Sequence, residues 1–265
     1  MLRVLASTIS VQLQQKLLHR EFWIQLFLER ILPLAIPLLV WMSLFRYTQQ
    51  ESLGGWAEHD MVAYYVLVFV VGILADIQFH YEMSTMVHMG TLNQWLIRPL
   101  TFFETAFSHI IARIIVLLIP GITALLLCRW FVPAAFTNLT LRSFVTACCV
   151  LPLSIAIFSL ISAAIGMCAF WVIKTDSIFA MAMLILEFFG GRLLPLNLLP
   201  VWLERISRLL PLRFAISGPV EAILHPSFPA TTLLLLGQSL WCILLSLLVV
   251  LLWHAGFSRY DAVGG

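Results

Sequence analysis

The sequence predicts an all-α membrane protein with six transmembrane helices in one domain that covers residues 1–265. Two observations carry this prediction. Charged residues make up 11% of the chain and hydrophobic residues 62%, whereas about a quarter of a soluble domain is charged. The chain also contains several unbroken apolar runs of about 20 residues, the length that crosses a bilayer as a helix. This excess of apolar surface needs lipid as its solvent.

The first 21 residues predict a helix that lies in the membrane interface. Apolar residues recur every three to four positions between Leu2 and Leu17, with Ser, Thr, Gln, Lys16 and Arg20 between them. This spacing gives a helix one apolar stripe and one polar face, which suits the interface plane. A soluble amphipathic helix packed on a partner is the alternative interpretation.

Six segments are expected to cross the membrane, and six crossings place both termini on the same side. Pro33 and Pro37 predict a kink in the first one, which neighbouring helices must compensate. The fifth apolar stretch has only about 13 residues, which is short for a spanning helix. The expected spans are residues 22–45, 61–79, 105–128, a part of 143–173, the short stretch that ends at Gly190-Gly191, and 231–253.

The segment 190–230 predicts an interrupted, re-entrant structure before the last span. Within it, Trp202, Ile206 and Leu209 lie on one helical face, opposite Glu204 and Arg208. Irregular backbone at membrane depth must be shielded by protein. The residues expected to break the helices here are Gly190, Gly191, Pro195, Pro200 and Pro211.

The segment 80–104, between the second and third spans, is longer than a tight turn requires. Its central part, GTLNQWLIRPL, joins a Gly break, an amphipathic turn and an Arg-Pro stop. Together with the six-span plan and the segment 190–219, it resembles the permeases of the type-2 ABC exporter superfamily, in the group of about 265-residue ABC-2 family transporter proteins. The resemblance covers nearly the whole chain.

The resemblance implies that 80–104 is a cytoplasmic coupling loop that docks into a separate ATPase, and that 190–230 dips back from the outer face. An ordinary interfacial loop anchored by Trp95 is the alternative for the first segment, because tryptophan is common at membrane boundaries. The coupling residues implied by the resemblance are Gly90, Leu92, Asn93, Trp95, Leu96, Arg98 and Pro99.

The sequence lacks the G-x-x-x-x-G-K-[ST] motif that holds ATP phosphates. We therefore expect that this chain binds no cofactor, and that ATP and Mg²⁺ bind to a partner ATPase. H-E-x-x-H and G-x-S-x-G motifs are also missing, so a transport subunit is favoured over an enzyme. An ion-coupled secondary carrier that works without an ATPase is the alternative function.

The expected partners are a cytoplasmic ABC ATPase, a second permease in a homodimer or heterodimer, and membrane lipid. Nucleic acid is not expected, because the Lys and Arg residues are scattered and form no basic stripe. The resemblance implies a multi-pass protein of the bacterial cytoplasmic (inner) membrane. Arg3, Lys16 and Arg20 favour cytoplasmic termini.

Ionisable residues inside the expected spans are costly and therefore suggest function. Asp76 is expected to pair with Arg113, on the same helical face as His109, as a clamp between helices or in a substrate or proton role. Glu187 precedes the Gly190-Gly191 break, so it is expected either to act in gating or to pair with Arg192. No metal site is expected.

The cargo prediction rests on the first, second and fifth spans. These spans are rich in Phe, Leu and Met and carry almost no charge. An amphipathic or lipid-like cargo therefore suits a pathway between them better than an ion or a sugar does.

Overall fold

The structure is a computed structural model that describes residues 20–75, 79–90, 102–137, 139–172 and 175–258, together with the helical positions 10, 14 and 18. For some helical residues, including 102–110 and 113, it describes the backbone alone. The predicted interfacial helix at residues 1–21 therefore lies mostly outside the described residues.

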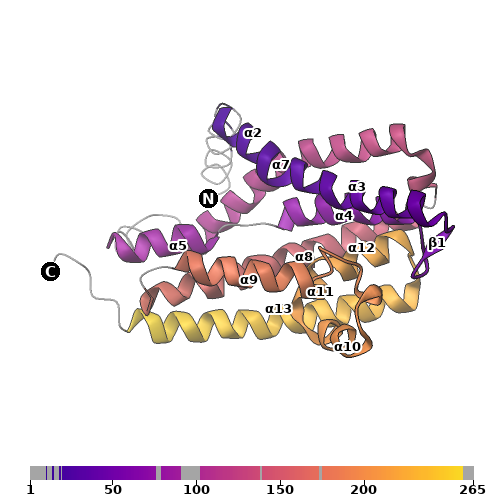
Figure 1. The fold of residues 1–265 in the computed structure, drawn as a ribbon. Coiled ribbons are helices and arrows are strands. Elements are labelled where there is room, and N and C mark those ends of the chain that lie inside the picture. The colour runs from indigo at the N-terminus through magenta and orange to yellow at the C-terminus, as the bar shows by residue number, and fades with distance from the viewer. Residues whose placement is uncertain are drawn as a thin grey trace.

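The described residues are helical, apart from one short hairpin and the connections between elements (Figure 1). The N-terminal half contains α2 (Arg20–Leu26), the π-helical turn η1 (Phe27–Ile31), α3 (Leu32–Thr48), strands β1 (Ser52–Leu53) and β2 (Trp56–Ala57), α4 (Glu58–Ala75), α5 (Phe79–His88) and α7 (Phe102–Phe131). The C-terminal half contains η2 (Pro133–Phe136), α8 (Leu141–Met167), η3 (Cys168–Phe170), α9 (Thr175–Phe189), η4 (Leu196–Leu198), α10 (Val201–Leu209), α11 (Pro211–Ala215), α12 (Ser217–Leu224) and α13 (Phe228–Phe257).

The π-helical turn η1 lies directly before Pro33, where a kink is predicted. A proline has no N–H to donate to the carbonyl group four residues earlier, and its ring clashes with that group. A π-turn accommodates this defect without ending the helix. The first predicted span is therefore divided into α2 and α3 next to Pro33, whereas Pro37 lies within α3.

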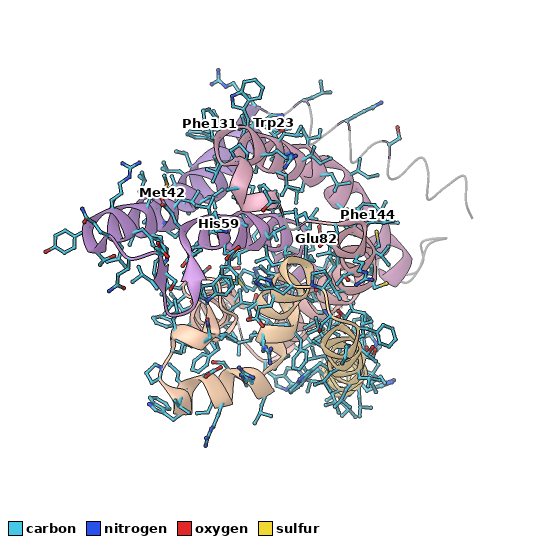
Figure 2. All side chains as sticks on the ribbon, turned by 90° about the vertical axis from the view of Figure 1, so that its right-hand side faces the viewer. Trp23, Met42, His59, Glu82, Phe131 and Phe144 are labelled. Carbon is cyan, nitrogen blue, oxygen red and sulfur yellow. The ribbon has the colours of Figure 1, made fainter. Side chains whose placement is uncertain are left out.

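Helix α4 is the centre of the bundle. Fourteen of its residues are buried, including Met61, Tyr64 and Tyr65, and it packs against α3, α7, α8 and α12. By contrast, α13 and the described side chains of α7 include many exposed large apolar residues, and the N-terminal end of α8 carries three. Figure 2, viewed along the bundle, shows Phe131 and Phe144 at its periphery; they are 76% and 67% exposed. This pattern is the one expected of a bundle whose outer surface meets lipid.

Four helical segments in the described residues are long and apolar enough to cross a membrane: Glu58–His88, Ile114–Phe131, Leu141–Phe170 and Phe228–Phe257. The chain is thus an all-α, multi-pass membrane protein, as predicted. The count of six spans stays a prediction, because α3 and α9 have 17 and 15 residues and fall below the length of a perpendicular crossing.

The elements at the two ends of the bundle differ. Tyr64 on α4 contacts Gly191, just after α9, so these two helices run antiparallel. Gln238 of α13 contacts Val150 of α8, and Gly256 lies beside Phe170, so α8 and α13 run parallel. In consequence α5 and the C-terminal end of α13 lie at one end, and the hairpin and α10 to α12 lie toward the other (Figure 1). We call these the α5 end and the hairpin end.

Two local structures differ from the sequence prediction. Residues 80–88 and 102–104 of the predicted coupling loop are helical, in α5 and α7. Phe79, Met83 and Val87 recur every four residues and are buried in a cluster with α8 residues, which explains why this part of the segment is a helix. A short hairpin, β1 paired with β2, lies in the connection between the expected spans 22–45 and 61–79.

Candidate functional site

A groove with a volume of about 690 Å³ lies between α3, α4, α9 and the turn that follows α9. We call it the apolar groove. Most of its lining is aliphatic or aromatic, and its polar groups are few. The main lining residues are Pro33, Pro37, Val40, Trp41 and Leu44 from α3, Tyr65, Val68 and Phe69 from α4, Phe179, Met183 and Glu187 from α9, and Arg192, Leu193 and Leu194 from the turn.

Two consecutive hydrogen bonds join three of the four elements that line the apolar groove. Trp41 Nε1 donates to the hydroxyl oxygen of Tyr65 at 2.8 Å. The Tyr65 hydroxyl in turn donates to the carbonyl oxygen of Leu193 at 2.8 Å. Tyr and Trp combine an apolar ring with one polar tip. The two hydrogen bonds therefore hold α3, α4 and the turn together, while the rings keep the groove surface apolar.

One charged pair lies at the groove wall. Arg192 Nη1 donates to Glu187 Oε1 at 3.0 Å, so the pairing that was one of two expectations for Glu187 is present. Arg192 also lies against α4: a Cβ atom on Gly72 would come within 3.1 Å of its Nη2 atom. Glycine at position 72 thus leaves room for the guanidinium group beside the helix.

The turn after α9 is held firmly to α4 and α12. Gly191 has a φ of +76°, which glycine adopts without strain. Its carbonyl oxygen accepts a 2.6 Å hydrogen bond from the Tyr64 hydroxyl, and the Ser217 N–H donates to the Gly190 carbonyl at 3.1 Å. The predicted break at Gly190-Gly191 is therefore a built turn between α9 and the following short elements.

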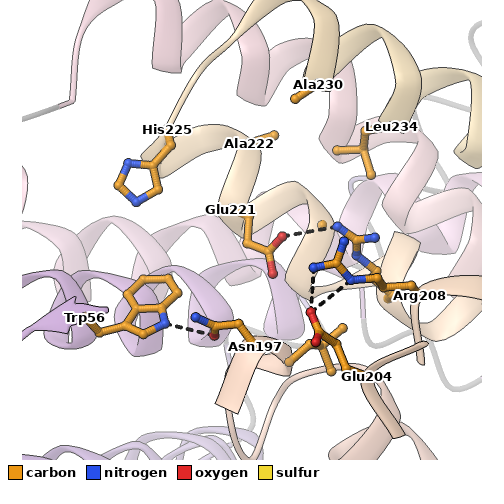
Figure 3. A pocket seen from close by; sticks show the side chains of 12 residues that line it. Trp56, Asn197, Glu204, Arg208, Glu221, Ala222, His225, Ala230 and Leu234 are labelled. Atoms are coloured by element: carbon orange, nitrogen blue, oxygen red, sulfur yellow. Dashed lines mark hydrogen bonds and ion pairs between the residues drawn. The ribbon is translucent and has the colours of Figure 1, made fainter. Parts of the chain in front are cut away.

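A second pocket, with a volume of about 370 Å³, lies among α10, α11, α12 and the hairpin (Figure 3). We call it the charged pocket. Arg208 donates to Glu204 Oε1 through Nε at 3.0 Å and through Nη2 at 2.5 Å. Arg213 Nη2 donates to Glu221 Oε2 at 3.3 Å. Two ion pairs thus face the same cavity.

The hairpin closes one end of the charged pocket. Trp56 Nε1 donates to Asn197 Oδ1 at 2.9 Å, and the Asn197 side-chain amide donates to the Gly54 carbonyl at 3.4 Å. Sequence reasoning missed Trp56 and Asn197. The signal for the hairpin was present, because two glycines between Leu53 and Trp56 are typical of a two-residue hairpin turn. The signal for the contact with Asn197 was not present, because the residues are far apart in sequence.

The predicted re-entrant residues lie at element boundaries. Pro195 precedes η4, Pro200 precedes α10 and Pro211 is the first residue of α11. Trp202, Ile206 and Leu209 are exposed on α10, as its predicted apolar face requires.

The structure describes only part of the other predicted sites. Gly90 follows α5 with a φ of +67°, a conformation typical of helix ends. His109 and Arg113 lie on α7, of which only the backbone is described at these positions. The remaining predicted residues lie outside the described residues: Asp76, Leu92, Asn93, Trp95, Leu96, Arg98 and Pro99.

Comparison with known proteins places this arrangement of apolar helices in a family. No curated protein and no solved structure matches the chain. A family model described as ABC-2 family transporter protein matches residues 31–264, a range that includes the apolar groove, the charged pocket and every described helix from α3 onward. The chain therefore belongs to the ABC-2 family of transporter proteins and is a membrane permease component of an ABC transporter.

Proposed function

We propose that this chain is the membrane-spanning subunit of an ATP-driven exporter, and that it works as a dimer with a separate ATPase that binds ATP and Mg²⁺. The proposal places it in the bacterial cytoplasmic membrane, with six crossings and both termini in the cytoplasm. Its main support is the family match over residues 31–264. The sequence has no ATP-binding motif of its own, so the energy must come from another chain.

The positions of the elements support six crossings. From α3 the chain reaches the hairpin end, returns through α4 to α5, and then runs through α7, α8, α9 and α13 in alternating directions (Figure 1). In this proposal the α5 end is cytoplasmic, because it carries α5 and Gly90, the start of the predicted coupling segment 90–99. The short helices α10 to α12 then lie at the outer face.

The apolar groove is the part of the pathway that this subunit contributes, and it is lined by α3, α4 and α9. These helices belong to the first, second and fifth predicted spans. The Glu187–Arg192 pair adds a polar contact to a wall that is otherwise mainly apolar. This combination suits an amphipathic cargo, whose apolar part would contact Val40, Phe69 and Met183.

The cargo proposal is tested by filling the groove. Val40→Trp places a large ring in the groove, whereas Leu39→Trp adds the same ring to a neighbouring side chain that is 65% exposed and does not line it. We expect Val40→Trp to weaken binding of a fluorescent NBD-labelled lysophospholipid to the purified chain by about tenfold, or about 1.4 kcal/mol. Leu39→Trp should leave the affinity unchanged. Equal affinities for the two variants would contradict the assignment of the groove.

The coupling proposal is tested with the double variant Trp95→Ala and Leu96→Ala. We expect this variant to insert and fold normally but to lose the transport-linked stimulation of ATP hydrolysis by its co-purified ATPase. Tyr81→Ala is the control, because Tyr81 is 61% exposed on α5 and lies outside the segment 90–99. Normal coupling in the double variant would contradict the role of this segment.

A further inference from the structure

The charged pocket holds two arginine–glutamate ion pairs that the transport proposal does not use. Figure 3 shows Trp56 and His225 at one end of the pocket and Glu204 with Arg208 at the other. Two arginines and two glutamates line it, so their formal charges cancel. A ligand with one charge would be repelled by the two groups of the same sign. A ligand that carries a positive and a negative group can place the first near a glutamate and the second near an arginine.

The Arg213–Glu221 ion pair retains unused capacity for hydrogen bonds. Among the described residues, the Glu221 carboxylate accepts a hydrogen bond at Oε2 and none at Oε1, so Oε1 can accept one from a ligand. Within the described part of the chain, the Arg213 side chain donates one hydrogen bond, although a guanidinium group has five donors. The side chains of Arg213 and Glu221 remain 24% and 34% exposed. This pair is thus open to a bound group that supplies one donor and one acceptor.

The pocket offers groups that can bind each charge of such a ligand. The guanidinium groups of Arg208 and Arg213 suit a phosphate, whose oxygens accept several N–H bonds at once. The Glu221 carboxylate suits an ammonium group, and the indole ring of Trp56 lines the same cavity. Aromatic rings attract cations through their faces. The pocket volume of about 370 Å³ lies in the range of small-ligand sites.

The surrounding surface places this pocket at the depth of lipid headgroups. On α10, Trp202 and Leu209 are 65% and 75% exposed, whereas Glu204 and Arg208 of the same helix line the pocket. A helix with these two faces lies in the interface plane, with its apolar face toward the acyl chains. Leu234 of α13 also lines the pocket, and α13 continues from there as a membrane-spanning segment.

We propose that the charged pocket binds a zwitterionic group with one ammonium and one phosphate, as in the headgroup of phosphatidylethanolamine. The phosphate pairs with Arg208 and Arg213, and the ammonium group pairs with Glu221 beside Trp56. An acyl chain attached to such a headgroup would lie along the exposed apolar surface of α13. This site is separate from the apolar groove, because the two share no lining residue.

The test measures lipid binding to the delipidated full chain in detergent by native mass spectrometry. The probes are phosphatidylethanolamine and phosphatidylglycerol with the same acyl chains, since the second has the phosphate but no ammonium group. We expect phosphatidylethanolamine to bind about tenfold more tightly. Glu221→Gln should remove this preference, and Arg213→Gln should weaken the binding of both lipids.

Two controls keep the outcome interpretable. Arg205→Gln removes a charge from an exposed residue of α10 that does not line the pocket, and it should leave both affinities within about twofold. If Arg213→Gln fails to fold, Arg208→Gln replaces it, because the Arg208 side chain is 56% exposed. The assay contains no ATPase, so its result is independent of the transport proposal.

A third probe separates the two sources of this headgroup chemistry. Glycerophosphoethanolamine, which has no acyl chain, should displace the lipid if the pocket recognises the headgroup alone. If it does not displace the lipid, the acyl chain is part of the recognised ligand. Displacement and its absence both agree with a zwitterion site and identify which form of the headgroup binds. Equal binding of the two lipids to the unaltered chain, or unchanged preference in Glu221→Gln, would overturn the proposal.

Discussion

At the scale of single residues, Gly54 and Gly55 provide the sharpest test of the hairpin. Both have positive φ values, +58° and +86°, and this pair of conformations is typical of a type I′ hairpin turn. A Cβ atom on Gly54 would overlap the side chain of Leu198, whereas one on Gly55 would meet open space. The two positions therefore share backbone strain but differ in packing.

We expect Gly55→Ala to lower the free energy of unfolding by about 1–2 kcal/mol, because a residue other than glycine is strained at positive φ. Gly54→Ala should cost about 1–3 kcal/mol more, because Leu198 must also move. Thermal unfolding of the two purified variants in the same detergent compares these costs. Equal midpoints for the two variants would show that the hairpin does not pack on Leu198.

A second prediction at this scale concerns the titration of Glu221. Burial raises the pKa of Glu221 above its usual range, and the positive charge of Arg213 offsets part of this effect. The folded state therefore holds the proton more tightly than the unfolded state, so the contribution of Glu221 to stability increases as the pH falls from neutral through the raised pKa. The charged and titratable groups around it are Arg213, Arg208, Glu204, Tyr64 and His225.

The difference in unfolding midpoint between the unaltered chain and Glu221→Gln isolates this effect. As the pH is lowered from 7 toward 5, the unfolding midpoint of the unaltered chain should rise relative to that of Glu221→Gln. Glu51→Gln, which removes a carboxylate from an exposed site near the hairpin, is the control variant. A pH-independent difference for Glu221→Gln would contradict the raised pKa.

At the scale of elements, the connection between α4 and the turn after α9 depends on one buried hydroxyl group. Tyr64→Phe leaves the Gly191 carbonyl oxygen without the hydrogen bond that it accepts from Tyr64. We expect a loss of about 1–3 kcal/mol in the free energy of unfolding, because the buried carbonyl loses its partner. Tyr47→Phe is the matched control, since Tyr47 is 88% exposed. A similar small effect for both variants would show that the turn is held by other contacts.

Long apolar elements could be predicted from the sequence, and short elements that depend on tertiary contacts could not. The expected spans 105–128 and 231–253 agree with Phe102–Phe131 and Phe228–Phe257 to within four residues at each end, because lipid requires an unbroken apolar helix. Helix α5 was missed because its polar residues hide an apolar stripe of Phe79, Met83 and Val87, whose partner is the distant α8.

The candidate sites show the same division. The helices that line the apolar groove could be predicted from their composition, and the turn that begins at the predicted Gly190-Gly191 break supplies the lining residues Arg192, Leu193 and Leu194. The hydrogen bonds of Tyr64 and Tyr65 to the turn could not be predicted, because they join residues 127 and 128 positions apart. The charged pocket required the fold, since it brings the hairpin against α10, α11 and α12.

At the scale of the whole molecule, the bundle has a buried centre and an apolar outer surface. Helix α4 is almost fully enclosed by its neighbours, whereas α13, the described side chains of α7 and the N-terminal end of α8 expose large apolar side chains. The apolar groove and the charged pocket lie on different sets of elements within this bundle. This arrangement lets cargo movement and lipid headgroup binding be measured independently.

The most direct test of the exporter proposal is affinity purification of the full chain from its native membrane in mild detergent, with the stoichiometry of every co-purified subunit. We predict an ATP-hydrolysing subunit in equal number to the permease, in a complex with two permease chains, and loss of that subunit from the variant with Trp95→Ala and Leu96→Ala. Recovery of the chain alone, from membranes that still carry out its transport, would contradict the exporter proposal and favour an ion-coupled carrier.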